Sequence, residues 1–141
     1  CSYNSLNSVD ILIKKGADFG KTLQNGIYPF LTAIQSGYYT TTLHLLLSNA
    51  NIGDINKATE TGMTPLHWAI YYDFPDIVKN LLSRGASLII GLKGNGMQPI
   101  HLACYLNRLE CLSILSKSEN AVLVFHLYIF LFNIHPVVLC F

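Results

Sequence analysis

The amino-acid sequence predicts an all-α solenoid in which pairs of short antiparallel helices stack on one another. Residues 62–70 read Gly-Met-Thr-Pro-Leu-His-Trp-Ala-Ile, and residues 96–104, at an offset of 34, read Gly-Met-Gln-Pro-Ile-His-Leu-Ala-Cys. A weaker copy, Gly-Ile-Tyr-Pro-Phe-Leu-Thr-Ala-Ile, occupies residues 26–34. Such periodic self-similarity indicates a repeat architecture. Each copy precedes an apolar segment spaced by three and four, as on one helix face: Leu43, Leu45, Leu46; Ile77, Val78, Leu81, Leu82; and Cys111, Leu112, Leu115.

The same pattern divides the chain into copies. Residues 9–18 read Val-Asp-Ile-Leu-Ile-Lys-Lys-Gly-Ala-Asp and resemble the end of an earlier copy. We therefore expect a partial copy, two complete copies, an incomplete copy and an apolar C-terminal tail, over residues 1–25, 26–61, 62–95, 96–120 and 121–141. Because the first residue is Cys1 rather than Met, we expect the chain to be a fragment of a longer protein.

Local signals predict where the first helix of each copy begins and ends. Thr64 can cap a helix with its hydroxyl, and Pro65 at the first helical position costs nothing because that N–H needs no partner. Gly37 favours the left-handed conformation that often ends a helix. Asp73 and Asn107, at the equivalent positions, also tolerate this conformation. Helices this short are unstable alone, so the copies must stack and share a core.

These residues resemble the ankyrin repeat family over roughly residues 5–121. The resemblance rests on Gly62, Thr64, Pro65, Leu66, His67, Ala69, Leu81, Leu82, Gly85 and Ala86, with a weaker echo in Gly96, Pro99, Ile100, His101, Leu102 and Ala103. It implies hairpin-like finger loops between the copies and a concave face that binds other proteins. The chain departs from the family pattern at Tyr28 and Gln98, where Thr is expected, at Leu31, where His is expected, and by a two-residue insertion between Asn49 and Gly62.

Composition narrows the classes of function. A length of 141 residues suits one domain, and 51% apolar residues exclude intrinsic disorder. The net charge of +1 gives no basic field that would attract nucleic acid. The four cysteines show neither a Cys-x-x-Cys pair nor a disulfide-scaffold spacing, so we expect a reducing compartment and a cytoplasmic location.

No cofactor, metal or catalytic site is expected. His67, His101, Cys104 and Cys111 are residue types that zinc selects, but each His recurs at one repeat position and both Cys fall on apolar faces. The resemblance implies that the imidazoles bond locally to hold the turn and the helix start. The glycines at 91, 94 and 96 lack the spacing of a phosphate-binding loop, and Asn95-Gly96 indicates a tight turn. No nucleophile and base pair emerges, so we do not expect an enzyme.

Tyrosines and finger residues are the candidate partner-binding site. Tyr71, Tyr72 and Tyr105 follow the first helices and lie off the apolar stripe, and Tyr is enriched at interfaces. The resemblance places these tyrosines on the concave face together with the finger residues Glu60, Thr61, Met63, Asn95 and Met97. The alternative is that the tyrosines only cover the edge of the core. The expected partner is another protein, with the chain acting as a scaffold or adaptor.

The tail, residues 121–141, carries no Lys, Arg, Asp or Glu and contains fourteen Leu, Ile, Val or Phe residues. Three interpretations remain open: a membrane span, a mis-translated non-coding stretch, or an apolar cap on the last copy. A span would make this chain the cytosolic ankyrin domain of a membrane protein, such as an ankyrin-containing S-acyltransferase or an ion channel. Membrane attachment through the tail is therefore the alternative to a freely diffusing cytoplasmic module.

Overall fold

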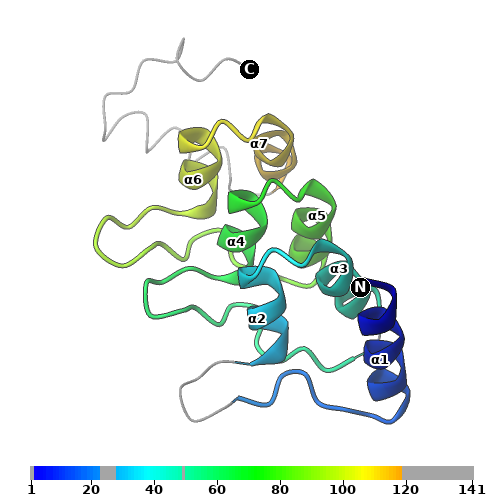
Figure 1. Cartoon of the computed structure of the whole chain (residues 1–141). Coiled ribbons are helices and arrows are strands. Elements are labelled where there is room, and N and C mark those ends of the chain that lie inside the picture. The colour runs from blue at the N-terminus through cyan, green and yellow to red at the C-terminus, as the bar shows by residue number, and fades with distance from the viewer. Residues whose placement is uncertain (1, 23–27, 49, 119–141) are drawn as a thin grey trace.

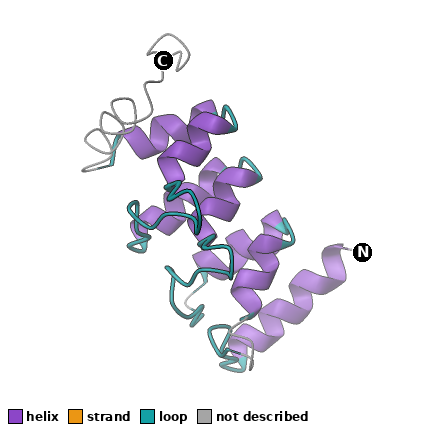
Figure 2. Cartoon of the chain, turned by 90° about the vertical axis from the view of Figure 1, so that its left-hand side faces the viewer, coloured by secondary structure: helices purple, strands orange, loops and turns teal. Residues whose placement is uncertain are grey.

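The computed structural model describes residues 2–22, 28–48 and 50–118, and all regular structure in these ranges is helical (Figure 2). The seven described helices are α1 (Ser2–Lys14), α2 (Pro29–Gln35), α3 (Tyr39–Leu47), α4 (Pro65–Tyr71), α5 (Pro75–Ser83), α6 (Pro99–Tyr105) and α7 (Leu109–Ser116). Helices α2 and α3, α4 and α5, and α6 and α7 form three pairs, and α1 packs against α3. The predicted solenoid of paired helices is thus confirmed.

The helices form two parallel rows. The inner row contains α2, α4 and α6, and the outer row contains α1, α3, α5 and α7 (Figure 1). Each inner helix contacts the next inner helix and its own outer partner, and the outer helices contact one another in the same order. The loops that join one pair to the next extend to the side of the inner row that faces away from the outer row (Figure 1). These loops are the fingers, and they meet the inner helices at an angle.

The inner helices begin and end where the sequence predicts. Each has a proline at its first position, and Thr64 caps α4 by accepting the His67 N–H at 3.5 Å. Just beyond the helix ends, the φ angles of Gly37, Asp73 and Asn107 are 73°, 58° and 56°. This left-handed residue turns the chain so that the next residue's N–H reaches back to the helix, as from Phe74 to the Ala69 carbonyl at 2.8 Å. The outer helix can then start within a few residues.

The shared core lies between the two rows. Leu81 and Ile77 of α5 and Leu115 of α7 are completely buried, and Leu45 of α3 is 2% exposed. The spacing of three and four had predicted these faces, and the described structure places them against the inner helices. Leu82 is only partly buried at the edge of this core.

The fingers are hairpin-like. In the finger between α3 and α4, the Thr59 N–H donates to the Met63 carbonyl at 2.9 Å. In the next finger the Leu92 N–H donates to the Met97 carbonyl at 2.9 Å. The two fingers lie against each other, because the Lys93 N–H donates to the Thr61 carbonyl at 3.0 Å. A Cβ at Gly62 would come within 2.7 Å of the Lys93 nitrogen, so this close approach needs a glycine.

The C-terminal tail lies outside the described residues, as does the end of the last predicted copy. The three interpretations of residues 121–141 therefore stay predictions. Within the ranges that the structure describes, no helix is both long enough and apolar enough to cross a membrane.

Candidate functional site

An open groove of about 710 Å³ lies in the angle between the inner helices and the fingers. Its walls come from α2, α4, the finger between α3 and α4, and the tip of the next finger. The lining residues are Leu31, Gln35, Lys57, Ala58, Thr59, Glu60, Thr61, Met63, Trp68 and Lys93. The groove therefore brings together three of the predicted site residues, Glu60, Thr61 and Met63.

The apolar part of the groove is formed by Leu31, Met63 and Trp68. Leu31 is buried, while Met63 and Trp68 are half-buried and pack against the core. Trp68 is the one tryptophan of the chain. Its indole Nε1 is buried and has no hydrogen-bond partner among the described residues. Leu31 stands where the family pattern has a histidine, so this departure places an apolar side chain beside the groove.

The polar part of the groove carries three charged side chains. Lys57 and Glu60 belong to one finger and Lys93 to the next, and all three are exposed. Within the described ranges none of them forms an ion pair; the short contact found there is a hydrogen bond between His44 Nε2 of α3 and Asp10 Oδ1 of α1, at 2.5 Å. Two ammonium groups and one carboxylate are thus free to meet a partner.

His67 connects α4 to the finger between α5 and α6 by hydrogen bonds at both ring nitrogens. Its Nδ1 accepts the Thr64 N–H at 3.2 Å, which assigns the proton to Nε2, and Nε2 then donates to the Met97 carbonyl at 3.2 Å. The ring links the start of α4 to the following finger, as the sequence-based interpretation of a local structural role expected. Burial lowers the pKa of His67 to about 4, so the ring is neutral at pH 7.

The described histidine and cysteine side chains are neither clustered nor ionised as a metal or thiolate site requires. Within the described part of the chain, no group of three His, Cys, Asp or Glu side chains is placed to hold a metal ion. Burial raises the pKa of the Cys104 thiol to about 11 and that of the Cys111 thiol to about 12. Both thiols are therefore protonated at pH 7, and a protonated thiol is a poor nucleophile.

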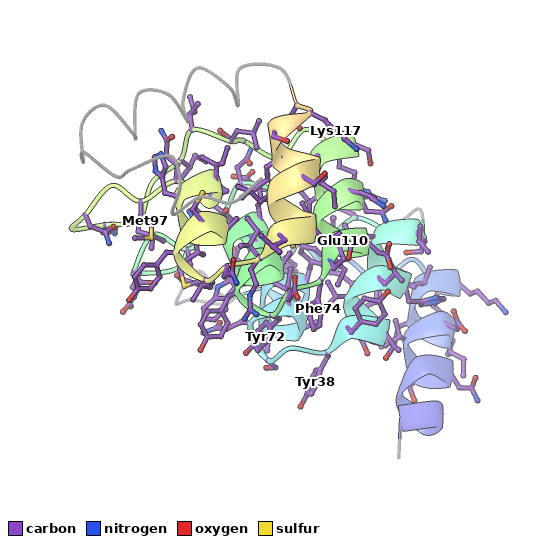
Figure 3. All side chains as sticks on the ribbon, turned by 90° about the horizontal axis from the view of Figure 1, so that it is seen from above. Tyr38, Tyr72, Phe74, Met97, Glu110 and Lys117 are labelled. Atoms are coloured by element: carbon purple, nitrogen blue, oxygen red, sulfur yellow. The ribbon has the colours of Figure 1, made fainter. Side chains whose placement is uncertain are left out.

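The three predicted tyrosines differ in their surroundings. Tyr71 and Tyr105 are 46% and 75% exposed, as expected for contact residues. Tyr72 is half-buried, and its hydroxyl donates to the Gln35 carbonyl of the preceding pair at 2.7 Å. Its ring stacks on Phe74 with centroids 5.6 Å apart, and the two lie side by side in Figure 3. Tyr72 thus joins two neighbouring pairs of helices.

The remaining predicted residues, Asn95 and Met97, belong to the finger between α5 and α6. The Asn95 side-chain oxygen accepts the Met97 N–H at 3.0 Å, so Asn95 shapes the turn. Met97 is half-buried, and Figure 3 shows it on the finger side, away from Glu110 and Lys117 on the outer row. Neither residue lines the groove, and the three tyrosines do not line it either.

Sequence reasoning missed several groove residues, notably Leu31, Gln35, Lys57, Trp68 and Lys93. Trp68 lies within the repeated signature, between the buried His67 and Ala69, and is half-buried against the edge of the core. Leu31 was noted only as a departure from the family pattern. The contribution of Lys93 depends on the contact between successive fingers, for which the sequence carries no local signal.

Comparisons with known proteins agree with this architecture. A family model described as "Ankyrin repeats (3 copies)" matches residues 1–91. The chain is 33% identical over 82 residues to alpha-latrotoxin-Lg1a of Latrodectus geometricus, and 48% identical over 64 residues to an ankyrin and IPT/TIG repeat-containing protein of Schizosaccharomyces pombe. These matches cover 58% and 40% of this chain, but only 6% and 5% of those proteins.

A third relative is matched over more of its length. The chain is 28% identical over 118 residues to an ankyrin repeat protein of Rickettsia bellii, covering 84% of this chain and 64% of the relative. Helices α6 and α7 extend the same pairing beyond residue 91, where the family match ends. The repeated signature, the two rows of helices and the family match lead to one conclusion: the chain belongs to the ankyrin repeat family.

Proposed function

We propose that this chain is a scaffold or adaptor module that binds a partner protein in the groove between its inner helices and its fingers. Ankyrin repeats are generally protein–protein interaction modules. The observation that carries the proposal is the groove itself, in which an apolar floor of Met63 and Trp68 is bordered by exposed polar finger residues. Apolar centres with polar rims are typical of protein interfaces.

The groove is held in shape by contacts that do not involve a partner. The Lys93 N–H bonds to the Thr61 carbonyl, and His67 connects α4 to the Met97 carbonyl. A surface that is ordered before binding loses little conformational freedom when a partner docks. Tyr71 extends this surface, because its ring packs edge-on against Trp68 with centroids 5.7 Å apart. We include Tyr71 and Tyr105 in the proposed contact surface as exposed aromatic residues of the inner row.

The proposal describes binding without chemistry. Ankyrin repeats are generally non-enzymatic binding modules. The described residues that line the groove include no histidine or cysteine, so these side chains offer neither a thiol nor an imidazole for catalysis. We propose the cytoplasm as its location, with attachment to a membrane through residues 121–141 as the alternative. A transcript that continues past Phe141 into polar residues and an Asp-His-His-Cys motif would favour the S-acyltransferase alternative.

Two exposed substitutions with opposite expectations test the proposed surface. Thr61→Tyr places a bulky neutral side chain in the groove, whereas Lys79→Glu alters an exposed position of α5. Proteins captured by the wild-type chain and identified by mass spectrometry should be lost with Thr61→Tyr and retained with Lys79→Glu. Melting temperatures of the two variants should match the wild-type value within about 2 °C. Equal capture by all three proteins, or equal loss in both variants, would contradict the proposal.

A further inference from the structure

We infer that the segment bound in the groove is acidic: an extended peptide that places a carboxylate between Lys57 and Lys93 and an apolar side chain against Met63 and Trp68. This inference rests on the proposed function and adds the chemistry of the partner. It follows from the charged side chains that line the groove, from the lack of an ion pair among them in the described structure, and from the apolar side chains in the same groove.

The two lysines approach the same groove from different fingers. Lys57 lies before the hairpin turn of one finger, and Lys93 lies at the tip of the next. The contact between Lys93 and Thr61 fixes these fingers relative to each other, so the positions of the two lysines along the stack are set by the backbone. Their side chains are exposed, and in the described structure neither ammonium group is neutralised by a carboxylate.

Among the residues that the structure describes, Glu60 is the one acidic side chain that lines the groove. It does not pair with either lysine within 4.0 Å, so the groove presents two unpaired positive charges and one negative charge. A carboxylate entering between the lysines is attracted by both and repelled by Glu60. A lysine or arginine entering there is repelled by both lysines and attracted by Glu60. Charge complementarity therefore favours an acidic segment. The two lysines should strengthen its binding, and Glu60 should weaken it.

The apolar residues of the groove explain why a purely charged segment would not cover its whole surface. Met63 and Trp68 offer apolar surface in the same groove that the charged side chains line, and the buried Leu31 lies beside them. A leucine or aromatic side chain of the partner would cover this surface, while a neighbouring Asp or Glu reaches the lysines. Extended peptides suit this geometry because successive side chains can alternate between the floor and the rim. A basic or neutral segment is the competing class, and the experiment separates the two.

The test selects the preferred segment from a random peptide library. Peptides are selected on the whole chain and counter-selected against Thr61→Tyr, which obstructs the groove without changing its charge, so that the retained sequences depend on the groove. Their affinities are measured through the fluorescence of Trp68, which reports on the groove alone because the chain has no other tryptophan. We expect the selected peptides to contain more Asp and Glu than Lys and Arg, next to at least one large apolar residue.

Charge variants then test the sign of each contribution. Replacing both lysines, as Lys57→Gln with Lys93→Gln, should raise the Kd of an acidic peptide roughly two- to tenfold, the range expected for two exposed ion pairs. Glu60→Gln should lower the Kd, and Lys79→Glu on the outer row should leave it unchanged. Raising the salt concentration from about 0.05 M to about 0.5 M should weaken wild-type binding more than binding to the double variant.

The possible failures differ in what they overturn. Selected peptides that are neutral or basic, or an acidic peptide that binds the double lysine variant as tightly as the wild type, would overturn the acidic partner while leaving the groove as a binding site. If no peptide distinguishes the wild type from Thr61→Tyr, the proposed function fails as well. Melting curves of all variants exclude unfolding as the cause, since the substituted side chains are exposed.

Discussion

The inner helices α2 and α4 occupy equivalent places in the stack but begin in different ways. At α4, Thr64 caps the helix and His67 bonds to both Thr64 and the following finger. At α2, Tyr28 provides no side-chain cap, and its hydroxyl instead donates to the Asp54 carbonyl at 2.8 Å. Both solutions tie the helix start to the next finger along the chain. The fold thus requires this connection, and more than one side chain can provide it.

The outer helices α3 and α5 both begin without a side-chain cap, and substitutions in their core should have the largest effect. Leu81 of α5 and Leu45 of α3 hold equivalent positions and are 0% and 2% exposed. Replacing either with alanine should lower the free energy of unfolding by about 2 to 5 kcal/mol, through lost burial and a residual cavity. Urea denaturation followed by circular dichroism measures this loss. A much smaller effect at one position would show that the two pairs do not share an equally packed core.

His67→Leu should convert the start of α4 toward that of α2 and change the pH dependence of stability. The pKa of His67 is about 4 in the folded chain, below its ordinary value of 6.5, so the unfolded state binds more protons between these pH values. This residue therefore lowers the free energy of unfolding by about 3 kcal/mol as the pH falls from 7 to 4. In the variant this part of the acid sensitivity should be absent.

Comparing the wild type with His67→Leu isolates the contribution of His67 to the pH dependence of stability, because the two proteins have the same carboxylates. At pH 7 the variant should be less stable by about 1 to 3 kcal/mol, since the Thr64 N–H and the Met97 carbonyl lose their partner. The difference between the two unfolding free energies should shrink as the pH falls to 4. A constant difference across this range would mean that His67 is not kept neutral by burial.

Removing one hydroxyl from each helix start should have smaller and similar effects. Tyr28→Phe deletes the hydrogen bond to the Asp54 carbonyl, and Thr64→Val deletes the cap of α4. Each should cost about 1 kcal/mol in urea denaturation. Burial raises the pKa of Tyr28, so its hydroxyl stays protonated and able to donate at any pH near neutrality. If only Thr64→Val destabilises, the cap is essential and the tyrosine is not its functional replacement.

The sequence predicted those features that depend on residues near one another along the chain. Pro65, Thr64 and the left-handed Asp73 each act within a few residues, so the helix limits could be read directly. The groove depends instead on contacts between pairs, such as that between Lys93 and Thr61. Leu31 and Lys93 are far apart in the sequence, and only the stacking of the repeats brings both to one groove. Of the predicted site residues, the groove therefore gathers Glu60, Thr61 and Met63, which are neighbours in one finger, and neither the residues of the next finger nor the tyrosines.

Tyr72 illustrates the same limit at a single residue. Its place at the helix end indicates a surface side chain, so the sequence predicts the same surface role for Tyr72 as for Tyr71. In the stack, however, its ring lies over Gly37 of the preceding pair, where a Cβ would come within 3.1 Å of the ring. The absence of a side chain at Gly37 leaves room for Tyr72, and Trp68 and Phe74 stack on it. The contact partner is one repeat away, so no local pattern reveals it.

The smallest expected effect distinguishes these two tyrosines. Tyr72→Phe removes the hydrogen bond to the Gln35 carbonyl but keeps the stacked ring, so it should lower the free energy of unfolding by about 0.5 kcal/mol. Tyr71→Phe has no such bond to lose among the described residues and should leave stability unchanged. Trp68 fluorescence during urea denaturation is a suitable measurement, because the Trp68 and Tyr72 ring centroids are 6.2 Å apart. Equal stability of both variants would assign Tyr72 to the surface with Tyr71, whereas a loss confined to Tyr72→Phe would show that this hydroxyl helps to hold α4 against the preceding pair.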